Sequence, residues 1–225
     1  PFITSLKAGQ LYSAGIFQRR ITGMALSNEP VIPRHYCNNH IVEGFTEAGS
    51  EVELYKNNRL CAFQYADEKG YYRFEFPLNY GSLRTKVKIY KPSGEITVRK
   101  ERIVTPHNFL PERVVSYDFK IGILDDGFSG IGEGNFFSQG YVAGGITGNI
   151  TLKAGAACFS GEQKVHYFSS VYARIKKRYL MDIYFSPGIK YGFGMEGCYP
   201  EGHNWKISYT RFPDERLLNL RLFKE

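Results

Sequence analysis

The second half of the chain consists of long runs in which apolar residues alternate with polar residues or glycine. Eight such runs can be marked, at residues 114–124, 137–146, 150–159, 164–174, 178–186, 189–198, 204–212 and 216–223. Alternation with a period of two predicts β-strands, because successive side chains of a strand point to opposite faces. A strand that crosses a bilayer at a tilt needs roughly 9 to 11 residues, whereas strands of soluble proteins average about five or six. The run lengths therefore favour a transmembrane antiparallel β-barrel, and a large soluble sheet with one solvated face stays open as the alternative.

The two faces of these runs differ in chemistry. In the run at 204–212, Trp205 and Ile207 share one face, while Lys206 and Ser208 share the other. We expect the apolar face to meet lipid and the polar or glycine-rich face to line a wet lumen.

The composition indicates an all-β chain and excludes several other classes. Of the 225 residues, 43% are hydrophobic and 23% charged, which excludes intrinsic disorder, and no stretch reaches the roughly 18 apolar residues of a transmembrane helix. Aromatic residues reach 16% and glycines number 24, which is typical of β-structure. The net charge of +7 suits nucleic acid, anionic lipid headgroups or a basic pore lining alike.

The ends and the cysteines add two expectations. The chain begins at Pro1 without an initiator methionine or a signal-peptide pattern, which predicts a fragment or mature segment of a longer product. The four cysteines, Cys37, Cys61, Cys158 and Cys198, are too scattered for a disulfide framework.

The first hundred residues divide into a hairpin, a linker and a compact module. Runs at 2–12 and 17–26 predict the hairpin, and Pro30, Pro33 and Asn38-Asn39 predict an irregular linker after it. Short runs at 51–55, 59–65, 71–76, 85–90 and 95–104, separated by turn residues, predict a β-sandwich. Period two predicts its inward residues as Val52, Leu54, Leu60, Ala62, Phe74, Phe76, Val87, Ile89, Ile96 and Val98, with Glu51, Glu53, Lys86, Lys88 and Arg99 facing water.

No catalytic, cofactor or metal site emerges from the remaining motifs. The glycine-rich stretch 130–134 lacks the helix that a phosphate cradle needs and is interpreted as a turn between strands. His35, Cys37, His40 and Cys61 match no standard zinc spacing, and no nucleophile signature is present. The basic run 174–178, Arg-Ile-Lys-Lys-Arg, is interpreted as a solvated hairpin loop rather than a nucleic-acid or lipid-headgroup patch. An enzyme is therefore not expected.

The order of elements resembles the pore region of bacterial outer-membrane fimbrial ushers, in which barrel strands flank an inserted β-sandwich plug. The segments that carry the resemblance are 20–27 before the plug, 41–45, 49–55 and 58–60 within it, and 110–112, 115–122, 137–141 and 145–152 after it. The family pattern has a glycine after Asn57, and Asn58 stands there instead. Asparagine also tolerates the left-handed conformation of a tight turn, so the hairpin is expected to persist.

This resemblance implies a fold, a location and partners. Residues 1–38 would be barrel strands leading into the plug, 39–105 the plug-like domain, and 106–225 further antiparallel barrel strands. The protein would lie in the bacterial outer membrane, in contact with its lipid, and would assemble and secrete pilus subunits delivered as periplasmic chaperone complexes, with the plug gating the channel. Neither nucleic acid nor a small-molecule substrate is expected. The alternative is a soluble or surface-attached all-β adhesion protein with an immunoglobulin-like module.

Polar contacts between plug and wall would hold the closed state, because both surfaces are hydrated when apart and each contact costs little to break. The residues expected to make these contacts are Glu51, Glu53, Arg99 and Lys100 on the plug and Lys190, Lys206 and Arg211 on the wall.

Overall fold

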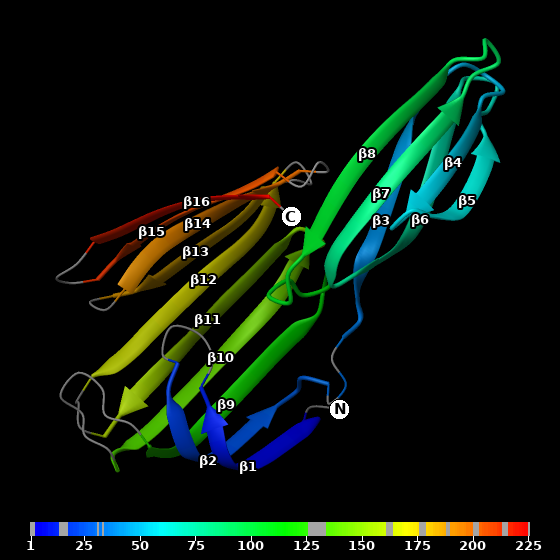
Figure 1. Cartoon of the computed structure of the whole chain (residues 1–225). Coiled ribbons are helices and arrows are strands. Elements are labelled where there is room, and N and C mark those ends of the chain that lie inside the picture. The colour runs from blue at the N-terminus through cyan, green and yellow to red at the C-terminus, as the bar shows by residue number, and fades with distance from the viewer. Residues whose placement is uncertain are drawn as a thin grey trace.

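A computed structural model describes residues 3–13, 18–30, 32, 34–125, 134–160, 164–175, 179–187, 190–199, 203–212 and 216–224. Most of the described strands form one ten-stranded antiparallel sheet (Figure 1). In spatial order its strands are β1 (Ser5–Tyr12), β2 (Arg20–Ser27), β9 (Val115–Leu124), β10 (Phe136–Thr147), β11 (Ile150–Phe159), β12 (Val165–Ile175), β13 (Tyr179–Ser186), β14 (Lys190–Cys198), β15 (His203–Arg211) and β16 (Arg216–Lys224). The ten runs predicted for this sheet are confirmed as strands, with ends that differ by a few residues.

The chain leaves this sheet after β2 and returns to it at β9, which pairs directly with β2. The two strands approach closely at a facing pair of glycines, Gly23 and Gly122. A Cβ atom on Gly23 would collide with the backbone at Ile121 and Gly122. The close pairing of β2 with β9 therefore requires glycine at this position. Everything between β2 and β9 is therefore an insertion into an otherwise sequential meander.

The large sheet is open at both edges. Within the described residues, β1 pairs only with β2, and β16 pairs only with β15. The closure into a barrel expected from the sequence consequently stays a prediction.

The sheet is curled, and its two faces differ as the alternation predicts. The outer face carries exposed apolar side chains such as Phe119, Ile183 and Leu220. The concave face is mostly polar, but at the end away from the insertion it holds an apolar cluster. That cluster consists of Ile21, Leu124, Phe137, Ala157, Phe159 and Phe168. The expected polar or glycine-rich inner face is thus not found at this end, where the β1–β2 hairpin curls over β10 and β11 and buries apolar side chains.

The insertion, called here the inserted unit (residues 36–105), consists of two sheets. β3 (Tyr36–Phe45) pairs with β6 (Tyr71–Asn79), and the second sheet has the order β5 (Arg59–Tyr65), β4 (Glu51–Lys56), β7 (Gly81–Tyr90) and β8 (Ile96–Thr105). The sheets share one core of Val52, Leu54, Tyr72, Phe74, Phe76, Val87 and Ile89. Asn58 has a φ of 66° in the β4–β5 turn, as the asparagine substitution predicts.

Two features of the inserted unit correct the sequence analysis. The segment around Asn38-Asn39 is part of β3 rather than a linker, and the strand accommodates it through a bulge between Tyr36 and Asn38. In addition, Leu60, Ile96 and Val98 are about half exposed or more. The register sets Ile96 opposite Tyr90 and Val98 opposite Lys88, so both side chains lie on the outer face of the sheet. The alternation of β8 is therefore shifted by one residue from the expected pattern, which moves each side chain to the other face.

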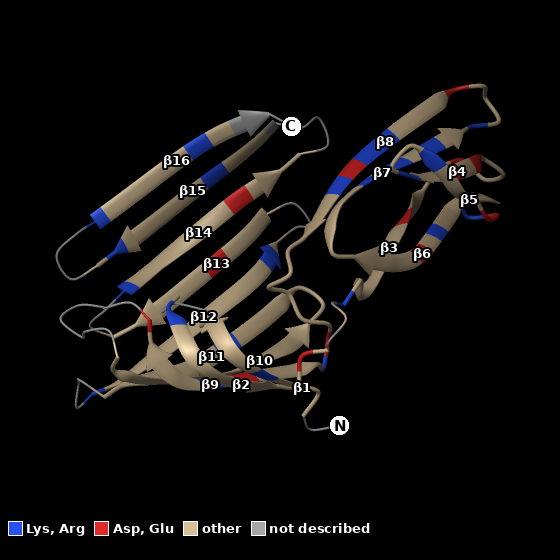
Figure 2. Ribbon diagram, turned by 60° about the horizontal axis from the view of Figure 1, so that its bottom comes forward, with Lys and Arg blue, Asp and Glu red and all other residues tan. Residues whose placement is uncertain are grey.

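The inserted unit lies off one end of the large sheet and extends away from it (Figures 1 and 2). Charged side chains concentrate on β7 and β8 of this unit and are sparser along the strands of the large sheet (Figure 2). The predicted turn at 130–133 and the basic residues 176–178 lie outside the described residues.

Candidate functional site

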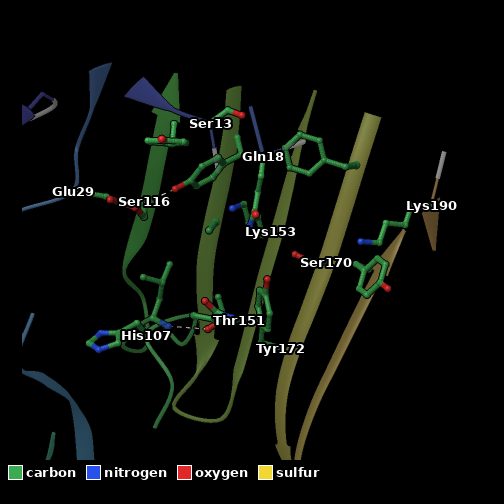
Figure 3. Close-up of a pocket in the computed structure, with 17 residues that line it drawn as sticks. Ser13, Gln18, Glu29, His107, Ser116, Thr151, Lys153, Ser170, Tyr172 and Lys190 are labelled. Atoms are coloured by element: carbon green, nitrogen blue, oxygen red, sulfur yellow. Dashed lines mark hydrogen bonds between the residues drawn. The ribbon is translucent and has the colours of Figure 1, made fainter. Parts of the chain in front are cut away.

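The concave face of the large sheet encloses a cavity of about 740 Å³. Side chains from β9 to β14 point into it, among them Ser116, Thr151, Lys153 and Lys190, and Glu29 enters from the segment after β2 (Figure 3). The lining therefore mixes hydroxyls, amides and charged groups with tyrosine rings and a few apolar side chains.

Two lysines on this face have partners within the wall. The Lys153 ammonium group lies 3.5 Å from the centre of the Tyr141 ring, and the Tyr141 hydroxyl donates to Glu29 Oε1 at 3.1 Å. Lys120 Nζ lies 3.0 Å from Asp118 Oδ1, and both of these side chains are largely buried. Lys120 and Lys153 are therefore held by partners within the wall itself.

The first connection to the inserted unit is fastened along β9. Asn28 donates its backbone N–H to Tyr117 O at 3.3 Å and accepts from Tyr117 N at 2.7 Å through its side-chain oxygen. Its side-chain amide also donates to Val115 O at 2.9 Å. Asn28 thus extends the pairing of β2 with β9 by one residue before the chain turns away.

The second connection is fastened by Arg174, at the end of β12. Its Nη2 donates to Val104 O and to Thr105 Oγ1, both at 2.9 Å, and the guanidinium carbon lies 5.2 Å from the centre of the Phe109 ring. Arg174 therefore ties the last residues of β8 to the large sheet. Sequence reasoning placed this residue in a solvated loop, and that interpretation is wrong for Arg174.

Further contacts complete this junction. Leu110 N donates to Thr151 Oγ1 at 2.9 Å. Asn38 accepts from Glu112 N at 3.1 Å and approaches Gly148 O at 3.5 Å with its amide nitrogen. The Tyr80 hydroxyl donates to Phe109 O at 2.7 Å, and burial raises the pKa of that hydroxyl. The sequence contains one indication of this role for Arg174. The residue stands at the end of the alternating run 164–174, at a position that faces inward.

The four contact residues predicted on the inserted unit do not share one face. Glu51, Glu53 and Lys100 lie on the outer face of the four-stranded sheet, where register pairs place them with Tyr90, Lys88 and Lys86. Arg99 has the opposite parity, and its Nη1 donates to the Tyr72 hydroxyl at 3.2 Å.

The three contact residues predicted on the wall also divide. Lys190 and Lys206 lie on the concave face, where Lys206 Nζ is 3.7 Å from Glu196 Oε2 and Lys190 Nζ is 5.1 Å from the centre of the Tyr184 ring. Arg211 lies on the opposite face and donates to the Tyr191 hydroxyl at 2.7 Å. Within the described residues, no ion pair joins either wall lysine to Glu51 or Glu53, so the plug–wall contacts stay a prediction.

The residues considered for zinc are dispersed. The His40 ring packs at a tilt against Phe76, and its Nε2 lies 3.5 Å from Glu101 Oε2, while Cys61 is exposed on β5. In the part of the chain that the structure describes, no three His, Cys, Asp or Glu side chains gather in a group that could hold a metal ion. No helix in that part is long and apolar enough to cross a membrane.

These features define an all-β protein in which a wide sheet, apolar outside and mostly polar inside, carries an inserted two-sheet unit. No protein-family model matches the chain, and no curated protein matches it. Among solved structures, a chain of the cryo-EM structure of an E. coli P pilus tip assembly intermediate, PapC-PapD-PapK-PapG, matches with a TM-score of 0.51 and 14% identity over 98% of this chain. The match covers 32% of that chain, so this protein spans about a third of its length.

Two structures of the translocation pore of the P pilus usher, PapC, also match. Their TM-scores are 0.33 and 0.39, at 15% and 13% identity, over 94% and 96% of this chain and 56% and 59% of theirs. The structural match to the usher PapC covers nearly the whole of this chain, at low sequence identity. The resemblance to ushers noted in the sequence is confirmed at the level of the fold.

Proposed function

We propose that the chain forms part of the wall of an usher-like outer-membrane pore that assembles and secretes pilus subunits. The inserted unit acts as the plug, and the subunits arrive as complexes with a periplasmic chaperone. The concave face lines the channel, and the mechanism is mechanical rather than chemical. The fold match to an assembly containing PapC, PapD, PapK and PapG supports these partners.

The observation that carries this proposal is the outer face of the large sheet. In the described strands β9–β14 no Lys, Arg, Asp or Glu stands at an outward position, and in β15 the one such residue, Arg211, is the last of the strand. Exposed apolar side chains follow one another across neighbouring strands, as at Val142, Leu152, Ile183 and Phe193. A soluble monomer rarely exposes a continuous apolar surface of this extent, whereas a lipid-facing sheet requires one.

Membrane fractionation is the first test of the pore. The full-length parent of this chain is expected in the outer-membrane fraction, with a gel mobility that changes on heating. A soluble, heat-insensitive product would end the pore proposal and leave a soluble or surface-attached all-β adhesion protein as the working hypothesis.

Closure of the pore by the inserted unit is the second part of the proposal. The predicted contacts are those of Glu51, Glu53, Arg99 and Lys100 with Lys190, Lys206 and Arg211. The shared outer-face position of Glu51 and Glu53 favours their pairing with the concave-face lysines, Lys190 and Lys206.

Charge reversal tests these contacts. Glu51→Lys combined with Glu53→Lys would set like charges against the two wall lysines, so the resting conductance of the pore in planar bilayers should rise. Restoring opposite charges with Lys190→Glu and Lys206→Glu should lower it again. Unchanged conductance in the first variant would overturn the assignment.

A further inference from the structure

The position of the inserted unit rests on a small area of contact. The unit reaches the large sheet through two connections, residues 28–35 and 106–114, and β8 approaches β14 beside the second connection. The shared core of Val52, Phe74 and their neighbours lies within the unit itself. The orientation of the unit is consequently set by the few side chains at the junction.

Arg174 is a charged side chain that crosses this junction. It belongs to β12, yet both acceptors of its Nη2 belong to the last two residues of β8. Thr105, one of the two, is fully buried, and the ring of Phe109 lies beside the guanidinium carbon. Hydrogen bonds from a charged donor are stronger than neutral ones, and a planar guanidinium holds its acceptors in a fixed geometry.

Two buried thiols lie around the same group. Cys37, at the start of β3, is 1% exposed, and Cys198, at the end of β14, is 3% exposed. Both lie within electrostatic reach of the Arg174 guanidinium, one from each of the two bodies. Burial raises the pKa of the Cys37 thiol, which further slows its reaction with alkylating reagents because the thiolate is the reactive form.

We propose that Arg174 is a positioning residue that latches the inserted unit to the end of the large sheet. Without this latch the unit turns about its two connections, and the junction opens between β8 and β14. That such turning gates a channel rests on the proposed function, whereas the latch itself does not.

Thiol alkylation of the full chain tests the latch. Three variants each keep one cysteine, Cys37, Cys198 or Cys61, with the other three changed to serine, and Arg174→Gln is introduced into each. We expect alkylation of Cys37 and Cys198 to accelerate by about tenfold or more, as local opening exposes a protected group. Cys61 is already exposed on β5 and should react at an unchanged rate.

Two further variants make the test specific. Arg174→Lys keeps the charge but only part of the hydrogen-bond geometry and should give an intermediate rate. Arg113→Gln alters another arginine near the junction, one with a side chain 91% exposed, and should leave both rates unchanged. Equal rates in Arg174→Gln and the unaltered protein would overturn the proposal.

A general loss of structure must be separated from opening of the junction. A fourth variant keeps only Cys158, which lies within β11 and faces Ser138 and Val165 on the neighbouring strands. If Arg174→Gln also accelerates alkylation there, the residue supports the whole sheet and the latch is refuted. Because the readout is thiol reactivity, the result stands whether or not the protein conducts ions.

Discussion

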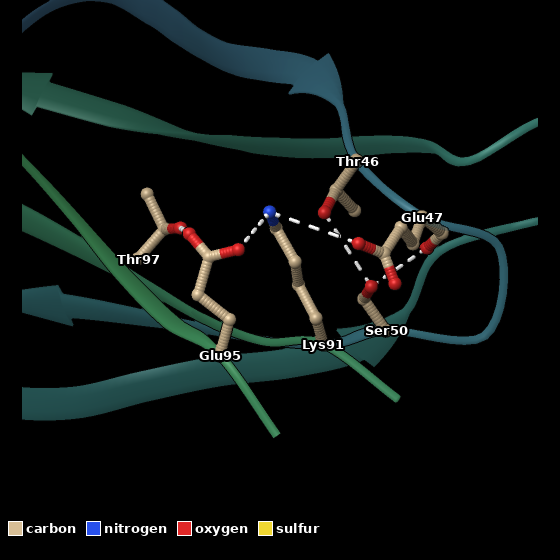
Figure 4. A network of polar contacts seen from close by, with 6 residues as sticks. All are labelled: Thr46, Glu47, Ser50, Lys91, Glu95 and Thr97. Carbon is tan, nitrogen blue, oxygen red and sulfur yellow. Dashed lines mark hydrogen bonds and ion pairs between the residues drawn. The ribbon is translucent and has the colours of Figure 1, made fainter. Parts of the chain in front are cut away.

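At the scale of single residues, Lys91 organises a network of polar contacts (Figure 4). The network lies at the end of the inserted unit that is far from the large sheet (Figure 1). The Lys91 ammonium group lies 2.6 Å from Glu95 Oε2 and 3.7 Å from Glu47 Oε1, and Thr97 donates to Glu95 Oε1 at 3.4 Å. The network joins the β7–β8 turn to the loop after β3. It thereby connects the two sheets of the unit outside their apolar core.

The Lys91–Glu95 pair predicts how the stability of this unit depends on pH. The nearby ammonium group lowers the pKa of Glu95 below its ordinary value. Because the pKa is lower in the folded state, the ionised Glu95 stabilises the unit at pH values above the unfolded-state pKa of about 4.3. This stabilisation is lost as the pH falls through the pKa of the folded state. Glu95→Gln should therefore lower the urea midpoint more at pH 7 than at pH 3. The exposed turn residue Glu68 supplies the control, as Glu68→Gln, and an equal deficit at both pH values would contradict the prediction.

At the scale of elements, β7 and β8 place like charges opposite each other. Lys86 faces Lys100, and Arg84 faces Arg102. Like charges at directly opposed positions destabilise a strand pair. The Lys86 ammonium group is partly accommodated by the Tyr55 ring, 4.6 Å away, whereas Lys100 is exposed.

Lys100→Glu should accordingly stabilise this strand pair, by about 0.2–1 kcal/mol, since it converts a repulsive cross-strand pair into an attractive one. Hydrogen exchange of the β7 and β8 amides measures the effect, and Lys100→Gln should give a smaller gain. The difference between the two variants should shrink in high salt. A gain that is equal in both variants and independent of salt would show that charge pairing with Lys86 is not its cause.

The elements also show where sequence reasoning succeeds and where it stops. Alternation located the strands of the large sheet because one face is apolar along almost every run, as at Ile183 and Phe185. It failed for β8, where Ile96 and Val98 share the outer face with Lys100. Parity there depends on the register set by the β7–β8 turn, which a single strand does not encode. The junction was missed for a related reason, because Arg174 meets Thr105 only after two distant segments are brought together.

At the scale of the whole molecule, the two faces of the large sheet meet different surroundings. Ile183 lies mid-strand in β13, between Val171 and Phe193 on the outer face. Ser208 lies mid-strand in β15, between Gly194 and Asn219 on the concave face. If lipid covers the outer face and water the concave face, a charged side chain lowers the stability of the folded state much more at position 183 than at position 208.

Arginine substitution at these two positions compares the faces directly. Ile183→Arg should reduce the free energy of folding into lipid vesicles by about 2–4 kcal/mol, the cost of a cation at the lipid-facing midplane of a barrel. Ser208→Arg adds the same side chain at a similar depth but on the lumen side, where water can solvate it, and should change the folding free energy far less. Urea titrations of folding, followed through the fluorescence of Trp205, measure both variants. Equal costs at the two positions would mean that the outer face is not lipid-facing, and the sheet would then need another partner to cover its apolar surface.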